Sequence, residues 1–359
     1  MKKNLFWLSI CFMLLTSVTL AQTQAPNPGF EDWPGSVTSS PKGWHSYDEA
    51  GGIFANAASN KSGNPTALER VTGHQGKYAC VIRCNKIMGV AANGALTTGR
   101  VYMGAMGAGS SKNYCFTDRA NGYAFKFTGR PDSVYFWAKF KMKGDVYATA
   151  KAHLHTDCDF RDFVDIGQPS DIASAILYFN DKGNGEWHQY KQAFKAYASP
   201  QKATAEKAPL PTLTNWTRKP SYLLFCFSTN RYVMKGSKGD ALYVDDIRMI
   251  YNKALSSIEI DGIKLNDFHK ETLEYTCFYS PDLMSGTLPC IDAQTESPRA
   301  TVSIKQATMD NPVAVITVSH DDVESGEAAP RIYRVHFVPT ENTEQTHQLS
   351  HRIIRQEHD

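Results

Sequence analysis

The chain is divided into short runs of strand-forming residues, and this pattern limits the folds open to it more than any other feature. From residue 27 to residue 252, runs rich in Val, Ile, Tyr, Phe and Thr are separated by Gly, Pro and Asn. Helical periodicity is nearly absent. Short strands at this density over about 225 residues indicate one large antiparallel β-sandwich of the jelly-roll type rather than several small domains. The clearest runs are 78–82, 133–141, 148–154, 176–179 and 222–227.

The sequence changes character after Tyr251, where a second and smaller module begins. Residues 257–265 predict a β-hairpin with Asp261-Gly262 at its turn, because an Asp-Gly pair readily adopts a two-residue hairpin turn. Their spacing with later strand-like runs is typical of an immunoglobulin-like sandwich. We therefore expect an all-β chain with a jelly-roll domain at 27–252, an immunoglobulin-like domain at 256–340 and a polar tail at 341–359. The later runs are 274–279, 300–305, 313–318 and 332–337.

The first 21 residues have the pattern of a secretory signal peptide. Lys2 and Lys3 precede an apolar run from Leu5 to Leu15, and a small-residue cleavage site follows at Ala21. The apolar run is too short to span a bilayer comfortably, so we expect it to be removed rather than to act as an anchor. No Cys stands at the expected cleavage point, which argues against a lipoprotein. The mature chain is expected to be secreted, in the periplasm or at the cell surface.

Charge and cysteine content limit the functions and bonds of the mature chain. Removing Lys2 and Lys3 from the 38 basic residues leaves 36, against 36 acidic residues, so the mature chain has no formal net charge. A nucleic-acid partner is therefore not expected. The spacing of the cysteines leaves two options open, a bridge within Cys80/Cys84 or Cys277/Cys290 and buried free thiols. The cysteines after the signal are Cys80, Cys84, Cys115, Cys158, Cys226, Cys277 and Cys290.

Two adjacent carboxylates interrupt an apolar run at 239–251. Asp245 and Asp246 stand among Leu, Val, Ile, Tyr and Met residues, so a regular strand would place one carboxylate on each face. A partly buried carboxylate costs several kcal/mol unless it is paired, hydrogen-bonded or bound to a metal ion. We therefore expect a cation or a dense set of backbone donors as its partner.

Four short motifs carry a resemblance to known proteins. They are the segments 27–33 (NPGFEDW), 41–45 (PKGWH), 73–79 (GHQGKYA) and 243–247 (YVDDI). With them, the first domain resembles the calcium-bearing jelly-roll carbohydrate-binding modules. Together with the second module, which begins SIEIDG at 257–262, nearly the whole mature chain looks like the carbohydrate metabolism domain (PCMD) family of secreted bacterial proteins.

The resemblance implies a structural calcium ion between the first and last strands of the jelly roll. It would place Glu31 and the Gly29 carbonyl opposite Asp245 or Asp246, with a further main-chain carbonyl near Lys77. Calcium takes six to eight oxygen ligands, mixing carboxylates and carbonyls, which suits these residues. In the alternative, the same carboxylates hydrogen-bond to turn amides or pair with an arginine. The arginines considered are Arg70, Arg83 and Arg248.

Aromatic residues suggest where a sugar would bind, because aromatic faces stack on sugar rings. Trp44 and Tyr47 lie in the segment 43–47, and Trp216 lies in a polar connection, so we expect these three to form exposed platforms. Trp137 and Trp187 stand inside apolar runs and are expected to pack in the core.

The segment 153–165 holds the densest set of ligand-type side chains. On a strand, His153 and His155 face the same way and could form half of a zinc or copper site, but a strand that ends in a polar loop or ligand-facing rim is the favoured interpretation. Asp157 and Asp159 are candidate catalytic carboxylates, together with Glu186 and Asp240, but no spacing selects a pair. Residues 180–186 faintly resemble a calcium loop and are expected to form a hairpin turn.

Three functions are consistent with these features. The sequence favours a secreted, non-catalytic protein that binds or handles a polysaccharide or oligosaccharide. A glycoside hydrolase or lyase that uses the acidic cluster at 157–165 is the second. The third is an adhesive or structural cell-envelope protein, with another envelope protein as its partner.

Overall fold

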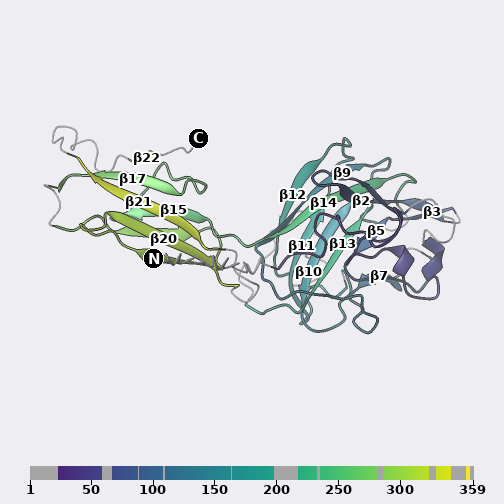
Figure 1. The fold of residues 1–359 in the computed structure, drawn as a ribbon. Coiled ribbons are helices and arrows are strands. Elements are labelled where there is room, and N and C mark those ends of the chain that lie inside the picture. Colours follow the sequence, from purple (N-terminus) through teal and green to yellow (C-terminus); the bar gives the residue numbers. More distant parts are fainter. Residues whose placement is uncertain are drawn as a thin grey trace, which may run out of the picture.

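The computed structural model describes residues 23–58, 67–87, 89–107, 110–162, 164–197, 217–232, 235–281, 286–322, 329–340 and 353–355. These residues form two β-rich lobes (Figure 1), with two short 3-10 helices, Tyr47–Glu49 and Ala55–Ala58, in the first lobe. The prediction of an all-β chain built from β-sandwiches is confirmed. In the described part of the chain, no helix is both long enough and apolar enough to cross a membrane. The predicted signal peptide lies outside the described residues.

The first lobe packs two antiparallel sheets against each other. The first sheet has the strand order β1-β2-β14-β9-β12, and the second has the order β11-β10-β13-β5, with β8 also paired to β13. The strands of this lobe are β1 (Leu68–Thr72), β2 (Tyr78–Arg83), β3 (Asn85–Ile87), β4 (Val90–Ala92), β5 (Ala95–Thr97), β6 (Arg100–Met103), β7 (Asn113–Phe116), β8 (Phe125–Lys126), β9 (Ser133–Lys141), β10 (Thr149–His155), β11 (Asp171–Tyr178), β12 (His188–Ala193), β13 (Tyr222–Ser228) and β14 (Ala241–Ile250).

Alternation along β9 shows how the sequence builds the first sheet. Val134, Phe136 and Phe140 are buried between the two sheets, and Phe136 lies 5.2 Å from Phe227 of the second sheet, measured between ring centroids. The residues between them on β9, Trp137 among them, face outward and are only partly buried. Because side chains alternate along a strand, β9 has an apolar inner face and an outer face of aromatic and lysine side chains.

The start of the chain lies against the last strand of this lobe. The motif NPGFEDW at 27–33 would be a brief strand in the jelly roll that the sequence resembles, but it is not one: Asn27 and Phe30 have positive φ angles of 39° and 52°, and the segment forms turns. Phe30 is nevertheless fully buried. The Ile247 N–H donates to the Pro28 carbonyl at 2.8 Å, so the two ends of the lobe are joined directly.

The second lobe contains a three-stranded sheet and a five-stranded sheet. Their orders are β16-β15-β18 and β19-β20-β21-β17-β22, and β17 runs parallel to β21. The predicted turn is present, with positive φ angles of 50° at Asp261 and 75° at Gly262. The strands are β15 (Leu255–Ile260), β16 (Ile263–Lys264), β17 (Glu274–Tyr279), β18 (Ile291–Thr295), β19 (Ala300–Lys305), β20 (Val313–His320), β21 (Arg331–Pro339) and β22 (Ile353–Arg355). Apart from β22, the predicted polar tail at 341–359 lies outside the described residues.

A buried polar junction joins the two lobes. Asp132 precedes β9, and its carboxylate accepts hydrogen bonds from Ser297 Oγ at 2.6 Å and Arg299 Nη2 at 3.0 Å. Its other oxygen lies 3.2 Å from His320 Nε2. Burial alone would raise the pKa of Asp132, but these three partners hold it below its usual value. One carboxylate of the first lobe therefore binds the turn between β18 and β19 and the end of β20 in the second.

The seven cysteines after the signal are all free thiols. Neither sequence-suggested bridge is formed: Cys80 and Cys84 are both buried, and Cys277 is buried whereas Cys290 is exposed. Burial raises the pKa of the Cys84 thiol to about 12 and that of Cys277 to about 11. The buried cysteines pack as small apolar residues.

Candidate functional site

The aromatic platform expected at the start of the chain is not exposed. Trp44 is 0% exposed, packs against Phe30 and Phe225, and donates its indole N–H to the Pro26 carbonyl at 2.7 Å. Tyr47 is half-buried, and its hydroxyl donates to the Asn93 carbonyl at 2.8 Å. The prediction for Trp44 is therefore wrong, because the turn at 41–44 directs the indole into the core, and the Tyr47 hydroxyl is already bonded within the protein. Trp216 lies outside the described residues.

The carboxylates expected to join the two ends of the jelly roll are Glu31, Asp245 and Asp246, and we call this group the clasp. In the structure, the clasp carboxylates lie against turn amides. The N–H groups of Lys77 and Tyr78 donate to Glu31 Oε1 at 2.8 and 3.0 Å. The N–H of His74 donates to Asp245 Oδ2 at 2.7 Å. In the described residues, the alternative of arginine pairing is not seen, because Arg83 pairs with Glu69, Arg70 lies over Tyr78 and Arg248 lies over Tyr135.

The chemistry of the clasp fits a hard cation such as calcium. Asp246 has a φ angle of 48°, which interrupts the β14–β9 ladder and brings its carboxylate beside Asp245. Burial raises the pKa of Asp245 to about 7 against the His74 amide, and the Asp246 charge adds to the rise. A Cβ at Gly76 would lie 2.3 Å from Glu31 Oε1, and one at Gly73 would lie 3.1 Å from Asp245 Oδ2, so the two glycines let the loop lie directly against both carboxylates.

A cation at the clasp would need main-chain ligands as well. Within the described ranges, no three His, Cys, Asp or Glu side chains are grouped as a metal site. Calcium sites commonly include main-chain carbonyls, such as those proposed at Gly29 and Lys77. The Lys77 carbonyl already accepts the Gly73 N–H at 3.2 Å.

Beside the clasp, the outer face of the first sheet presents a group of aromatic rings. Lys139 Nζ lies 5.0 Å from the Trp187 ring and 4.7 Å from the Tyr243 ring, so the ammonium is held between two aromatic side chains. Trp137 lies two residues before Lys139 on β9 and therefore on the same face, opposite Gln189 of the edge strand β12. Trp137, Trp187 and Tyr243 are each only partly buried. We call these residues the aromatic face: Trp137, Lys139, Trp187, Gln189 and Tyr243.

His74 connects the clasp to the aromatic face. Its ring stacks on Trp137 with centroids 3.8 Å apart and planes 18° apart. Its Nδ1 lies 3.3 Å from Asp246 Oδ2, while its backbone N–H binds Asp245. The loop that satisfies the buried carboxylates therefore also fixes one side of the Trp137 indole.

The core positions expected for Trp137 and Trp187 are wrong. For Trp137, the sequence contains a signal that would have placed it on the outer face. Along β9, Val134, Phe136, Ala138 and Phe140 form one alternating set, whereas Tyr135, Trp137, Lys139 and Lys141 form the other. The lysines mark the second set as the solvent side, because Lys is almost never fully buried without a partner. Trp137 therefore belongs to the outer face despite the apolar run around it.

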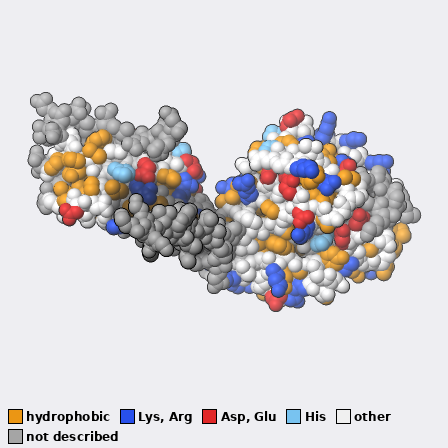
Figure 2. All heavy atoms as spheres, viewed as in Figure 1, with side chains coloured by type: hydrophobic (Ala, Val, Ile, Leu, Met, Phe, Trp, Pro, Cys, Tyr) orange, Lys and Arg blue, Asp and Glu red, His pale blue; other side chains and the backbone are white. Residues whose placement is uncertain are grey.

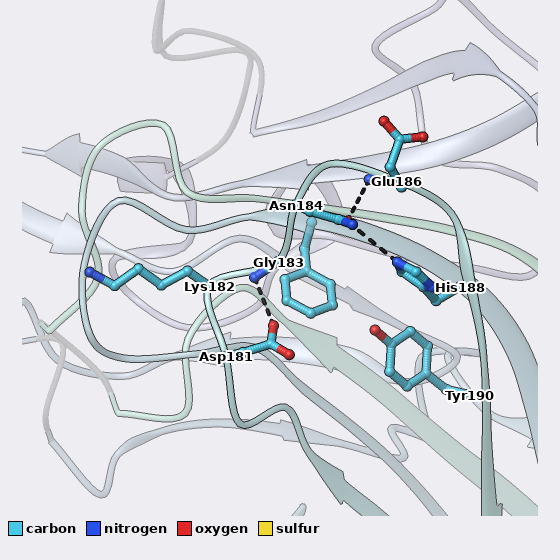
Figure 3. Close-up of a pocket in the computed structure, with 8 residues that line it drawn as sticks. Asp181, Lys182, Gly183, Asn184, Glu186, His188 and Tyr190 are labelled. Atoms are coloured by element: carbon cyan, nitrogen blue, oxygen red, sulfur yellow. Dashed lines mark hydrogen bonds between the residues drawn. The ribbon is translucent and has the colours of Figure 1, made fainter.

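A pocket of about 320 Å³ lies on the other side of the edge strand β12. Along β12, His188 and Tyr190 point to the inner side, opposite Ala138 and Phe136, whereas Gln189 points to the aromatic face. The segment that connects β11 to β12, two strands of different sheets, closes the pocket, and Figure 3 shows the side chains that line it. Its lining residues are Phe140, Asp181, Lys182, Gly183, Asn184, Glu186, His188 and Tyr190. The hairpin turn expected at 180–186 is wrong, because β11 and β12 do not pair and the segment crosses from one sheet to the other.

The histidines at 153–155 are buried, and their ring nitrogens are occupied. His153 contacts Ser174 Oγ at 2.7 Å and Asp162 Oδ1 at 3.0 Å. His155 contacts Thr117 Oγ1 at 2.8 Å and the Thr156 carbonyl at 2.9 Å. Burial lowers the pKa of His155 to about 4. These contacts leave no ring nitrogen of either histidine directed at a shared metal ion.

The acidic cluster that follows is engaged in ion pairs. Asp157 and Asp159 both bind the guanidinium of Arg119, at 2.6 and 3.0 Å. Asp162 lies 2.9 Å from Lys151 Nζ; burial would raise its pKa, but Lys151 and His153 hold it well below the usual range. A glycosidase needs a carboxylic acid with a raised pKa, and Asp162 has the opposite shift.

The other two candidate catalytic carboxylates lie apart from this cluster. Asp240 is 0% exposed and accepts hydrogen bonds from the Lys143 N–H at 2.7 Å and the Ser237 N–H at 2.8 Å, so it anchors two loops. Glu186 lines the pocket beside β12. The structure therefore does not bring the four sequence candidates together into one site.

Surface charge of both signs is interspersed over the first lobe. In the view of Figure 2, Lys and Arg alternate with Asp and Glu there and form no large patch of one sign. This distribution agrees with the balanced charge of the mature chain.

Comparisons with known proteins give only distant structural similarity. No protein-family model matches the chain, and no curated protein matches it. A family 61 carbohydrate-binding module solved with β-1,4-galactotriose is 13% identical, covers 64% of this chain and 98% of its own, and has a TM-score of 0.29. The family 11 carbohydrate-binding module of a cellulosomal cellulase from Clostridium thermocellum is 11% identical, with 64% and 95% covered and a TM-score of 0.27. The K2 cleaved adhesin domain of Lys-gingipain is 10% identical, with 64% and 97% covered and a TM-score of 0.29.

At these identities and TM-scores, what this chain binds has to be argued from its own geometry.

Proposed function

We propose that the protein is a non-catalytic glycan-binding protein that holds a polysaccharide or oligosaccharide on the aromatic face. The observation that carries the proposal is the grouping of Trp137, Trp187 and Tyr243, all partly exposed, on the outer face of the first sheet. Aromatic side chains offer large apolar area in a fixed geometry, which suits the C–H face of a sugar ring. Lys139 and Gln189 lie among them and supply hydrogen-bond donors for sugar hydroxyls.

Binding is favoured over catalysis by the state of the carboxylates. Hydrolysis of a glycosidic bond uses two carboxyl groups that flank the bond, one of them a proton donor. Asp157 and Asp159 share one arginine, Asp162 is paired with Lys151, and Asp240 is buried under amide donors. A hydrolase or lyase at 157–165 is therefore the weaker proposal, and an adhesive role has no specific contact in its favour.

The proposal includes secretion and a structural calcium ion. The signal-peptide pattern supports export to the periplasm or cell surface, where polysaccharides are available. Calcium bound by Glu31, Asp246 and nearby carbonyls would join the first segment of the jelly roll to β14, and it would neutralise the paired aspartates. Membership of the PCMD family stays a prediction from the sequence motifs.

The proposal is tested by affinity electrophoresis and calorimetry against a panel of cell-wall and dietary polysaccharides. We expect at least one to bind the mature protein, and Trp187→Ala to weaken that binding by about 10-fold or more, as for a central aromatic contact. Tyr232→Ala is the matched control, because Tyr232 is 56% exposed and is not part of the aromatic face. Failure of the folded protein to bind any member of a broad panel would remove the proposal.

A further inference from the structure

The pocket beside β12 is separate from the aromatic face, although both are built on the same strand. Alternation sends Trp187 and Gln189 to one side of the sheet edge and His188 and Tyr190 to the other. The aromatic face lies on the outer side of the first sheet, whereas the pocket is a partly open cavity. Its volume is about 320 Å³, within the range of small-molecule sites. A chain lying on the aromatic face has the pocket directly across one edge strand.

Apolar rings form the inner part of the pocket. Phe140 is buried and packs edge-on against Phe179 with centroids 4.7 Å apart. Tyr190 packs against Phe136 and Phe179, at 6.0 and 4.8 Å between centroids. Gly183 crosses over Phe140 so closely that a Cβ would lie 2.4 Å from its ring, and the left-handed φ of 67° also requires glycine. The pocket therefore has a rigid apolar floor.

Two polar groups of the pocket have no hydrogen-bond or ion-pair partner within the described part of the protein. In that part, neither the Tyr190 hydroxyl nor the Glu186 carboxylate makes a hydrogen bond or ion pair. Figure 3 shows the Tyr190 hydroxyl directed into the space between the turn and His188. Burial raises the pKa of Tyr190, so its hydroxyl remains a hydrogen-bond donor at neutral pH. Convergent polar groups over an apolar floor are the usual composition of a small-molecule site.

The charge of the pocket is acidic. Asp181 and Glu186 both belong to the lining, and Figure 3 shows the Glu186 carboxylate at its rim, directed away from Tyr190. The ammonium of Lys182 is directed away and lies 2.8 Å from Asp145, outside the lining. The remaining basic group, His188, is exposed and lies 3.4 Å from the Asn184 side chain. A carboxylate on a ligand would therefore be repelled by these side chains, without a cation in the pocket to compensate.

We propose that this pocket is a subsite for one sugar residue without a carboxylate in the bound glycan, and that it discriminates against uronic acids. The proposal rests on the proposed glycan-binding function. The sugar's C–H face packs on the Phe140 and Tyr190 rings. Its hydroxyls bond to the Tyr190 hydroxyl, the His188 ring and the acidic side chains, while a sugar carboxylate is repelled by Asp181 and Glu186.

Calorimetry with matched neutral and uronic oligosaccharides tests the proposal on the mature protein. We use β-1,4-galacto-oligosaccharides with oligogalacturonates, cello-oligosaccharides with oligoglucuronates, and chitosan oligosaccharides as a cationic arm. The expected result is that a neutral ligand binds and its uronic counterpart binds at least about 5-fold more weakly. Equal or tighter binding of the uronic counterpart would overturn the proposal. Weaker binding of the chitosan oligosaccharide than of the neutral ligand would also overturn it, because an acidic pocket attracts a cation.

Two variants separate the pocket from the aromatic face. Tyr190→Phe removes only a hydroxyl and is expected to weaken binding of the neutral ligand about 3- to 10-fold, as for one hydrogen bond. The matched control Tyr178→Phe, on the other sheet, is expected to have no effect. The double variant Asp181→Asn with Glu186→Gln is expected to reduce discrimination against the uronic ligand by about 5-fold.

The outcomes distinguish failure of the pocket from failure of the function. If Trp187→Ala weakens binding while Tyr190→Phe and the double variant leave affinity and discrimination unchanged, the subsite is wrong and glycan binding on the aromatic face stands. If the folded wild-type protein binds none of these oligosaccharides and no polysaccharide of the panel, both proposals are overturned.

Discussion

The two sheets of the first lobe carry similar side chains on their outer faces and use them differently. The outer side of the first sheet has Trp137, Lys139 and Tyr243, which are partly exposed. The outer side of the second sheet has Lys151 and His153, which are covered by the β6–β7 hairpin and the loop at 156–170. There the packed apolar residues are Phe160, Ile166, Ile176, Tyr197, Leu224 and Cys226, with Cys115 and Tyr178 at their margin.

The difference shows that density of functional side chains does not mark a site by itself. The covered face holds the chain's richest set of His and Asp residues, yet each is bonded within the protein. The exposed face holds fewer ionisable groups and leaves ring surfaces open to solvent. We therefore interpret the covered face as structural and the exposed face as the binding surface.

The largest expected effect is loss of stability from the covered face. Asp162→Ala removes the carboxylate that neutralises Lys151, whose side chain is 15% exposed. Removing one partner of a buried ion pair costs about 3–5 kcal/mol, so the free energy of unfolding in urea should fall by that amount. Glycan affinity of the remaining folded protein should not change. A stable variant that has lost its affinity would reverse the roles of the two faces.

The covered face should also make stability depend on pH. Burial lowers the pKa of His155 to about 4, below its unfolded value of about 6.5, so protonation favours the unfolded chain. The contribution is fully present above about pH 6.5 and is lost as pH falls towards 4, by up to about 3 kcal/mol. His155→Phe, which keeps a ring between Phe160 and Tyr222, should flatten this dependence in urea unfolding at pH 7, 5.5 and 4.

His45 has a similarly lowered pKa of about 4, caused by burial and then by Arg100, and so contributes in the same direction. It stays in place in both proteins, so the difference between their slopes isolates His155. Equal slopes would mean that His155 is not held neutral by the fold.

A smaller effect is expected from calcium at the edge of the exposed face. An ion that binds only the folded clasp stabilises it by about 2.7 kcal/mol when its concentration is 100 times its Kd. EDTA should therefore lower the melting temperature of the mature protein, and Glu31→Gln should reduce the difference between calcium and EDTA. An unchanged melting curve would mean that the amide donors from His74, Lys77 and Tyr78 suffice.

Most of the strand positions could be predicted from the sequence, because period-2 patterning and turn residues act locally. The runs at 133–141, 274–279 and 300–305 match β9, β17 and β19 residue for residue. The segment 27–33 could not be recognised as a turn, since the positive φ angles at Asn27 and Phe30 depend on docking against β14. No local pattern announces that contact.

The candidate site was less predictable, because exposure depends on what covers a sheet. Trp44 follows a glycine in a polar segment, yet the long-range packing with Phe225 buries it. Trp137 lies in an apolar run, yet nothing in the described residues beyond the His74 loop covers its outer face. The pocket forms because the segment that connects β11 to β12 passes over Phe140. Sequence spacing does not specify that contact.

The central claim is that glycan binds the exposed face of the first sheet and not the covered face of the second. Oxidative footprinting of the mature protein with and without a bound polysaccharide, read by mass spectrometry, tests it most directly. The account predicts that the polysaccharide protects Trp137 and Trp187 and leaves Tyr178 and Tyr222 unchanged. Protection confined to Tyr178 and Tyr222, with Trp137 and Trp187 oxidised equally in both samples, would contradict it.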